Sequence, residues 1–134
     1  FNTAIDLYIE ECCNSYLAIL HDSTITIKDK IDALFTSIGD EHSNMQYYDF
    51  FHRVENEELH EQLSIKLCKY MYPHLLEAVK KAIAAKEIYI ENPEALISFI
   101  IYGQVGLLSK SNIDHHEVAK LLNQYVNQLM KFNP

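Results

Sequence analysis

Residues 92–109 read NPEALISFIIYGQVGLLS and contain the clearest helix signal in the chain. Asn92 suits the N-cap position, and Pro93 suits the first helical position, where its missing amide donor costs nothing. The rest is apolar on nearly all sides, and we expect the helix to be covered from several directions. The residues that make it so are Ile97, Phe99, Ile100, Ile101, Tyr102, Val105, Leu107 and Leu108.

Helix signals continue on both sides of this stretch. Downstream, Asp114 with Glu117 three residues later predicts the start of a last helix with a single apolar stripe. Upstream, apolar spacing predicts a long helix over about residues 57–86. Pro73 lies in its middle, where it removes an amide donor and clashes with the carbonyl of Lys69. We therefore expect a kink or a break there.

Two further helices are expected near the beginning of the chain. The first spans about residues 3–20 and has no N-terminal cap. The second follows Thr26, a candidate N-cap with Asp29 three residues on, and is stopped by Gly39. The pattern predicts an all-α bundle of five to six helices.

Composition agrees with this fold class. The chain has 134 residues, which suits one domain over 1–134, and 49% of them are hydrophobic, enough for one core. Three Gly and three Pro are too few for the turns of an all-β fold. The formal net charge is −8 and Arg53 is the only arginine, so we do not expect this chain alone to bind DNA.

The cellular setting is predicted from cysteines and apolar runs. No run of 18 apolar residues and no secretory signal is found, so no membrane association is expected. Three cysteines, of which Cys12 and Cys13 are adjacent, suit a reducing compartment such as the cytoplasm. They are either small buried hydrophobes or oxidant sensors. Because the chain begins with Phe1, we expect an upstream segment to be missing.

Catalytic and metal-binding patterns are lacking. There is no HExxH, no His-x3-His and no G-x-S-x-G, and Glu-x-x-His occurs in a single copy, at Glu57–His60. We therefore expect no enzyme activity, no metal and no cofactor.

Aromatic residues are the feature that suggests a binding site. Nine Tyr and six Phe occur, many on core-facing stripes, where they either fill the core or line a cavity for a small organic molecule. A kink at Pro73 would open such a cavity between the long helix, the first helix and the helix after Pro93. The predicted ligand-binding residues are Ile9, Cys12, Tyr16, Leu67, Tyr70, Met71, His74, Phe99 and Tyr102. They carry no permanent charge, so we expect a neutral or weakly polar ligand, oriented by His74 and Tyr102.

Self-association is also expected, because the helix after Pro93 is apolar on more faces than a small monomer can cover. Its partner in a four-helix interface would be the last helix. The predicted homodimer interface comprises Ile97, Ile101, Val105, Leu108, Val118, Leu122, Tyr125 and Leu129.

The order of helices resembles the C-terminal regulatory domain of TetR-family transcriptional regulators. The stretches that carry the resemblance are Phe1–Tyr8, Leu59–Leu63 through Pro73–Leu76, and Glu91–Leu96. It implies a bacterial cytoplasmic repressor that dimerises through its last two helices. A small effector would move the first helix and, with it, an upstream helix-turn-helix that binds DNA and is absent from this chain. The family often has glycines where the long helix ends, whereas this chain has Ala84–Glu87, so we expect the helix to continue further.

Two other classes remain open: a helical metal-binding or enzymatic bundle, and a protein-interaction module without a pocket. Ionisable residues that converge inside the bundle would favour a metal-binding or enzymatic function. A bundle without a cavity would favour a protein-interaction module.

Overall fold

The computed structural model describes residues 2–40, 57–108 and 114–132, and in these ranges it contains helices and no strand. The fold class predicted from the sequence is confirmed. The helices are α1 (Asn2–Leu20), α2 (Ile27–Asp40), α4 (Glu57–Ala84), α5 (Pro93–Leu108) and α6 (His115–Met130).

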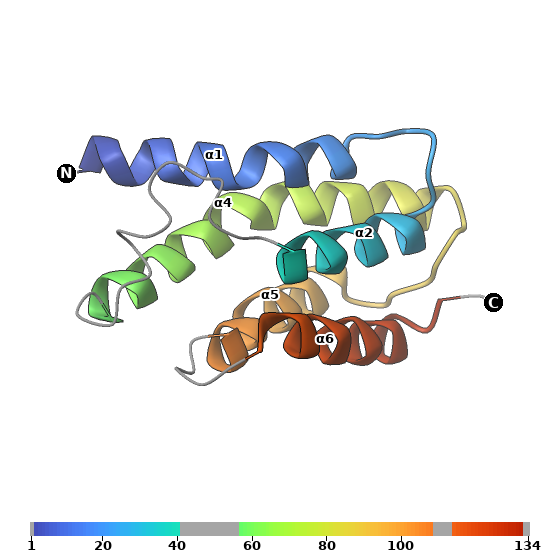
Figure 1. Cartoon of the computed structure of the whole chain (residues 1–134). Helices are drawn as coiled ribbons and strands as arrows, with labels where there is room; N and C mark the ends of the chain where they lie inside the picture. The colour runs from blue at the N-terminus through green and yellow to red at the C-terminus, as the bar shows by residue number, and fades with distance from the viewer. Residues whose placement is uncertain (1, 41–56, 109–113, 133–134) are drawn as a thin grey trace.

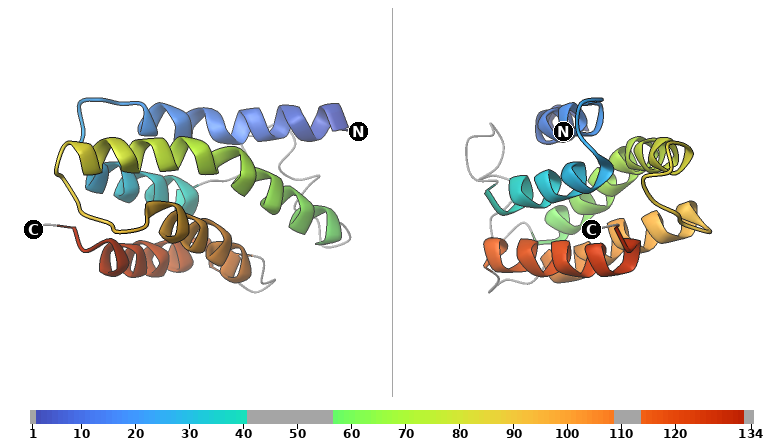
Figure 2. Two further views of the ribbon diagram at one scale, coloured as in Figure 1. Left: turned by 180° about the vertical axis from the view of Figure 1, so that it is seen from behind. Right: turned by 90° about the vertical axis from the view of Figure 1, so that its right-hand side faces the viewer.

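The five helices stack in three layers (Figures 1 and 2). Helix α1 forms the top layer in Figure 1, α2 and α4 the middle, and α5 and α6 the bottom. The most extensive contacts join α2 to α6, α4 to α5 and α1 to α4. The middle layer is therefore covered on both sides. Each of the five helices can then contribute side chains to the same interior.

Side-chain caps fix the starts of three helices where the sequence predicts them. The N–H of Asp29 donates to Thr26 Oγ1 at 3.2 Å, and the N–H of Ala95 donates to Asn92 Oδ1 at 3.0 Å. Asp114 Oδ1 accepts from the N–H groups of His116 and Glu117 at 2.9 and 3.4 Å. Each bond satisfies a backbone donor that has no partner within its own helix.

Helix α4 differs from the expectation at its C-terminal end. It runs through Pro73 without a break and bends along its length (Figure 1). It stops at Ala84, two residues before the predicted end at about residue 86, so the expected longer helix is wrong. The N–H of Lys86 donates to Ile83 O at 3.0 Å and the N–H of Glu87 donates to Ala82 O at 2.9 Å, which is the bond pair of a Schellman motif. Lys86, with φ 64°, takes the left-handed conformation that favours glycine.

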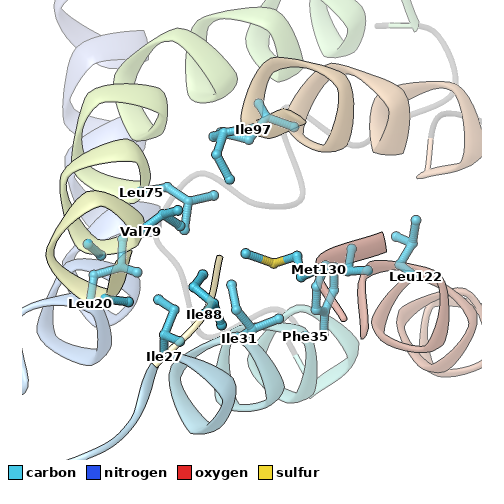
Figure 3. Packing of buried hydrophobic residues seen from close by; sticks show 14 of the residues in the cluster. Leu20, Ile27, Ile31, Phe35, Leu75, Val79, Ile88, Ile97, Leu122 and Met130 are labelled. Carbon is cyan, nitrogen blue, oxygen red and sulfur yellow. The ribbon is translucent and has the colours of Figure 1, made fainter. Parts of the chain in front are cut away.

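The core is formed mainly where the layers meet. Figure 3 shows side chains from four helices, Ile31, Leu75, Ile97 and Met130, directed toward a common interior. A second buried cluster joins α1 to α4. It consists of Ile5, Tyr8, Ile9, Cys12, Cys13 and Leu63.

The structure corrects half of the predicted dimer interface. Ile97, Ile101, Val118 and Leu122 are at most 8% exposed, because they face the core of their own chain, and a second copy cannot reach them. Val105 is half-buried, and the side chain of Leu108 lies outside the described part. Tyr125 and Leu129 are exposed by 47% and 46%. An apolar stripe must be buried, but its spacing does not say against which partner.

Candidate ligand-binding cavity

A cavity of about 200 Å³ lies inside the bundle, and all five helices contribute to its wall. Helix α1 supplies Cys12, Cys13 and Tyr16, and α2 supplies Ile31, Leu34, Phe35 and Ile38. Helix α4 supplies Ser64, Leu67, Cys68, Met71 and Leu75. The remaining wall is Ile97, Ile100, Ile101, Gln104 and Val105 of α5 with Val126 and Met130 of α6.

The wall is apolar, and its described residues include no Asp, Glu, Lys, Arg or His. Its polar side-chain groups are the hydroxyls of Tyr16 and Ser64, the amide of Gln104 and three thiols. Such a surface suits an apolar ligand, because few water molecules would find the two to four polar partners that a buried water needs.

All three cysteines of the chain line this cavity, and none of them forms a disulfide. Cys68 Sγ donates a hydrogen bond to Ile101 O at 3.5 Å, which joins α4 to α5. Burial raises the pKa of the Cys68 thiol to about 11. The thiol is therefore protonated near neutral pH and is a poor nucleophile.

Gln104 has a buried side-chain oxygen without a hydrogen-bond partner among the described residues. Its Oε1 atom is buried and accepts no hydrogen bond there. Gln104 follows Ile97 and Ile101 at helical spacing, so it shares the core-facing side of α5. A buried acceptor without a donor is costly and is uncommon in folded proteins.

Four of the nine predicted ligand-binding residues line the cavity: Cys12, Tyr16, Leu67 and Met71. Ile9 is buried in the cluster between α1 and α4, and together with Tyr70 it borders a separate surface groove. His74 packs its ring 5.7 Å from the rings of both His21 and Tyr70, away from the cavity wall.

Phe99 and Tyr102 do not close the cavity, contrary to expectation. They are 67% and 37% exposed, and they lie on the outer side of α5. The helix is apolar all round, so its spacing did not reveal which side faces inward. His74 and Tyr102 are therefore not the polar groups of the cavity.

Sequence reasoning missed the contribution of α2 and of Gln104. The stripe Ile27, Ile31, Leu34, Phe35 and Ile38 in α2 was a usable signal for a core-facing wall. Gln104 was visible as the single amide in an apolar helix, but only the fold shows that it points inward.

The described residues form neither a metal site nor a membrane span. No group of three or more His, Cys, Asp or Glu side chains described there is placed to hold a metal ion. Glu57–His60 belong to α4, but their side chains lie outside the described part of the structure. Within the described helices, none has the length and apolar character needed to cross a membrane.

No protein-family model, curated protein or solved structure matches this chain.

Proposed function

We propose that this chain is the effector-binding and dimerisation domain of a TetR-like transcriptional regulator, a cytoplasmic repressor in bacteria. The observation that carries the proposal is an apolar cavity of about 200 Å³ walled by all five helices. A bundle that served only as a spacer or docking module would gain packing energy by filling this space.

The position of α1 at the cavity supports a regulatory role. Cys12, Cys13 and Tyr16 of α1 belong to the wall, so an occupied cavity changes what α1 packs against. In the proposed protein a helix-turn-helix precedes α1 and moves with it. The effector must bind the DNA-incompetent arrangement better than the competent one, because a ligand shifts an equilibrium only by its difference in affinity.

Ligand binding can be tested with a thermal-shift screen of small neutral compounds on the chain. A ligand at a hundred times its Kd adds about 2.7 kcal/mol to the free energy of unfolding. Ile100→Phe, which places a larger side chain in the cavity wall, should abolish the shift. Phe99→Leu on the exposed side of α5 is the matched control and should retain it. If no compound stabilises the wild type selectively over Ile100→Phe, the effector proposal fails.

The regulatory half of the proposal needs the upstream segment. The longer protein should bind a pseudo-palindromic DNA site in a mobility-shift assay and lose affinity when a compound from the screen is added. The present chain alone should bind no duplex at physiological salt, because its net charge is −8. Tight DNA binding by the present chain would contradict this division of labour.

Homodimerisation is proposed through the outer faces of α5 and α6. Six large apolar side chains are exposed there by 37–67%: Phe99, Tyr102, Leu107, Leu121, Tyr125 and Leu129. Gly103 and Gly106 are also exposed on α5, with nothing within 4 Å of the position of an added Cβ, so another helix can approach closely. Exposed apolar surface of this kind is typical of an interaction site.

The dimer proposal predicts opposite effects for two neighbouring substitutions. Tyr125→Asp should leave the protomer folded but give a monomer mass in light scattering at tens of micromolar, because it places a charge on the outer face. Leu122→Asp should unfold the protomer, because Leu122 is 7% exposed in its own core. A monomeric wild type at that concentration would refute the interface.

A protein-interaction module is the second candidate, and the same exposed faces favour it. Only a regulator needs an open cavity, so Ile100→Phe distinguishes the two functions. An interaction module with this substitution should still bind its partner normally. A regulator with the same substitution should no longer respond to its effector.

A further inference from the structure

We infer that the cavity takes an uncharged ligand with an apolar body of one or two fused rings and one hydrogen-bond donor, which meets Oε1 of Gln104. This inference rests on the proposed function, because it names the chemical class of the effector. Three properties of the cavity carry it: its volume, the absence of charge among the described residues of its wall and the unpaired oxygen of the Gln104 amide.

The volume limits the size of the ligand. An engineered cavity of about 150 Å³ lined by Leu, Ile and Phe stays dry and binds benzene. The present cavity, of about 200 Å³, is somewhat larger and similarly lined. It therefore has room for a single substituted ring or two fused rings.

The wall limits the charge of the ligand. Among the residues that the structure describes, no acidic, basic or imidazole side chain lines the cavity. An ion bound there would lose its hydration without gaining a counter-charge, and such a transfer is strongly unfavourable. Carboxylates, phosphates and ammonium compounds are therefore excluded as tight ligands.

Gln104 sets the polarity of the ligand. Its buried Oε1 lacks a donor among the described residues, and it belongs to the wall of the cavity. The Cys68 thiol does not supply that donor, because it donates to the carbonyl of Ile101. A ligand N–H or O–H that reaches Oε1 would satisfy the oxygen, whereas a ligand without a donor would leave it buried and unpaired.

Indole and benzofuran test the donor directly. The two bicyclic rings have nearly the same shape, but indole has an N–H donor where benzofuran has an oxygen acceptor. By isothermal titration of the whole chain, we expect indole to bind about tenfold more tightly than benzofuran. Indole-3-carboxylate, which is charged, should bind much more weakly than indole.

A variant of Gln104 and a control variant test whether Gln104 causes the preference for indole over benzofuran. Gln104→Met keeps a similar length and removes the amide, so indole and benzofuran should bind it with equal affinity. Gln128→Met on the exposed side of α6 is the matched control and should keep the tenfold preference. Because the comparison of probes on the wild type needs no variant, the inference stays testable even if Gln104→Met fails to fold.

The possible failures are distinguishable. Equal affinities of indole and benzofuran for the wild type, an unchanged preference in Gln104→Met, or tight binding of indole-3-carboxylate would each overturn the ligand class. These outcomes leave the proposed function standing, because each requires an occupied cavity. If neither neutral ring binds at millimolar concentration, this inference is overturned, and the effector proposal loses its supporting observation.

Discussion

Glu87 accepts a hydrogen bond from the backbone N–H of Ile27, at 2.9 Å between that nitrogen and Oε1, although the two residues are 60 positions apart. Ile27 is the first residue of α2, and its N–H has no acceptor within the helix. The carboxylate of Glu87 also lies where the positive end of the helix dipole stabilises a negative charge. The segment after α4 thereby fixes the start of α2, which forms one wall of the cavity.

Replacing Glu87 should therefore destabilise the bundle. Glu87→Ala leaves the N–H of Ile27 without this acceptor, and we expect a loss of about 1 kcal/mol in the free energy of unfolding. Glu87→Gln keeps an oxygen acceptor and should lose less. Urea unfolding of the three proteins measures both values. Equal stability of wild type and Glu87→Ala would mean that the bond contributes nothing.

The left-handed conformation of Lys86 predicts a stabilising substitution. Lys86 is exposed and has φ 64°, a region that glycine enters without the steric cost paid by other residues. Lys86→Gly should raise the free energy of unfolding by about 0.5–1 kcal/mol, and Lys86→Val should lower it.

A matched control for Lys86 lies in the interior of α4, the helix that ends just before it. Lys66 is exposed in the interior of α4, where glycine is a poor helix former. Lys66→Gly should cost about 1 kcal/mol. If Lys86→Gly destabilises the protein as Lys66→Gly does, the Schellman end assigned to α4 is wrong.

The Cys68 thiol should be protected from alkylation in the folded protein. Burial raises its pKa from 9.0 to about 11, so almost no thiolate is present at pH 8. Iodoacetamide should label Cys68 only after denaturant is added, as read by mass spectrometry of peptides. Rapid labelling of Cys68 in the native protein would contradict the buried position.

The same thiol contributes to the pH dependence of stability. Since its pKa is higher in the folded chain, the unfolded chain loses this proton first as pH rises. The stabilisation that the protonated Cys68 thiol gives the folded chain is fully present below pH 9.0 and is lost as the pH rises toward about 11. Cys68→Ala should therefore show a smaller loss of stability over this range than the wild type.

Asp32 should make stability fall in acid. Burial acts to raise its pKa, but hydrogen bonds from Lys28 and from asparagines of α6 outweigh burial and leave the pKa below the ordinary 3.8. Asn127 Nδ2, for example, donates to Asp32 Oδ1 at 3.4 Å and so joins α6 to α2. A carboxylate with a lowered pKa stabilises the fold above its unfolded value, and this stabilisation is lost as pH falls through the folded pKa.

Urea unfolding from pH 6 down to pH 2.5 tests this sign. Asp32→Asn should flatten the acid limb below about pH 4. Lys28→Gln removes the ammonium donor, whose Nζ is 2.8 Å from Asp32 Oδ2, and should make the acid limb shallower than in the wild type, because the folded pKa of Asp32 then lies closer to its unfolded value. Identical acid limbs in wild type and Asp32→Asn would refute the role assigned to Asp32.

The helices and three of their starts could be predicted because they depend on neighbouring residues. Thr26, Asn92 and Asp114 each cap a helix by bonds to residues two or three positions away. Such contacts are readable in a sequence without knowing the fold. The end of α4 was harder, since Lys86 occupies a conformation usually given to glycine.

The cavity could be predicted only in part. Its walls in α1 and α4 follow from single apolar stripes, and four predicted residues lie there. Helix α5 has no single stripe, so the inward position of Gln104 and the outward position of Phe99 could not be read from spacing.

Local chemistry was therefore sufficient for the helical class, the capped starts of helices and the apolar character of the interior. The tertiary structure decided which apolar residues became core and which stayed outside. Leu122 and Tyr125 share one predicted stripe, yet α2 packs against α6 and buries Leu122 to 7% exposure while Tyr125 keeps 47%. Burial depends on the helix that packs opposite, and that partner comes from a distant part of the chain.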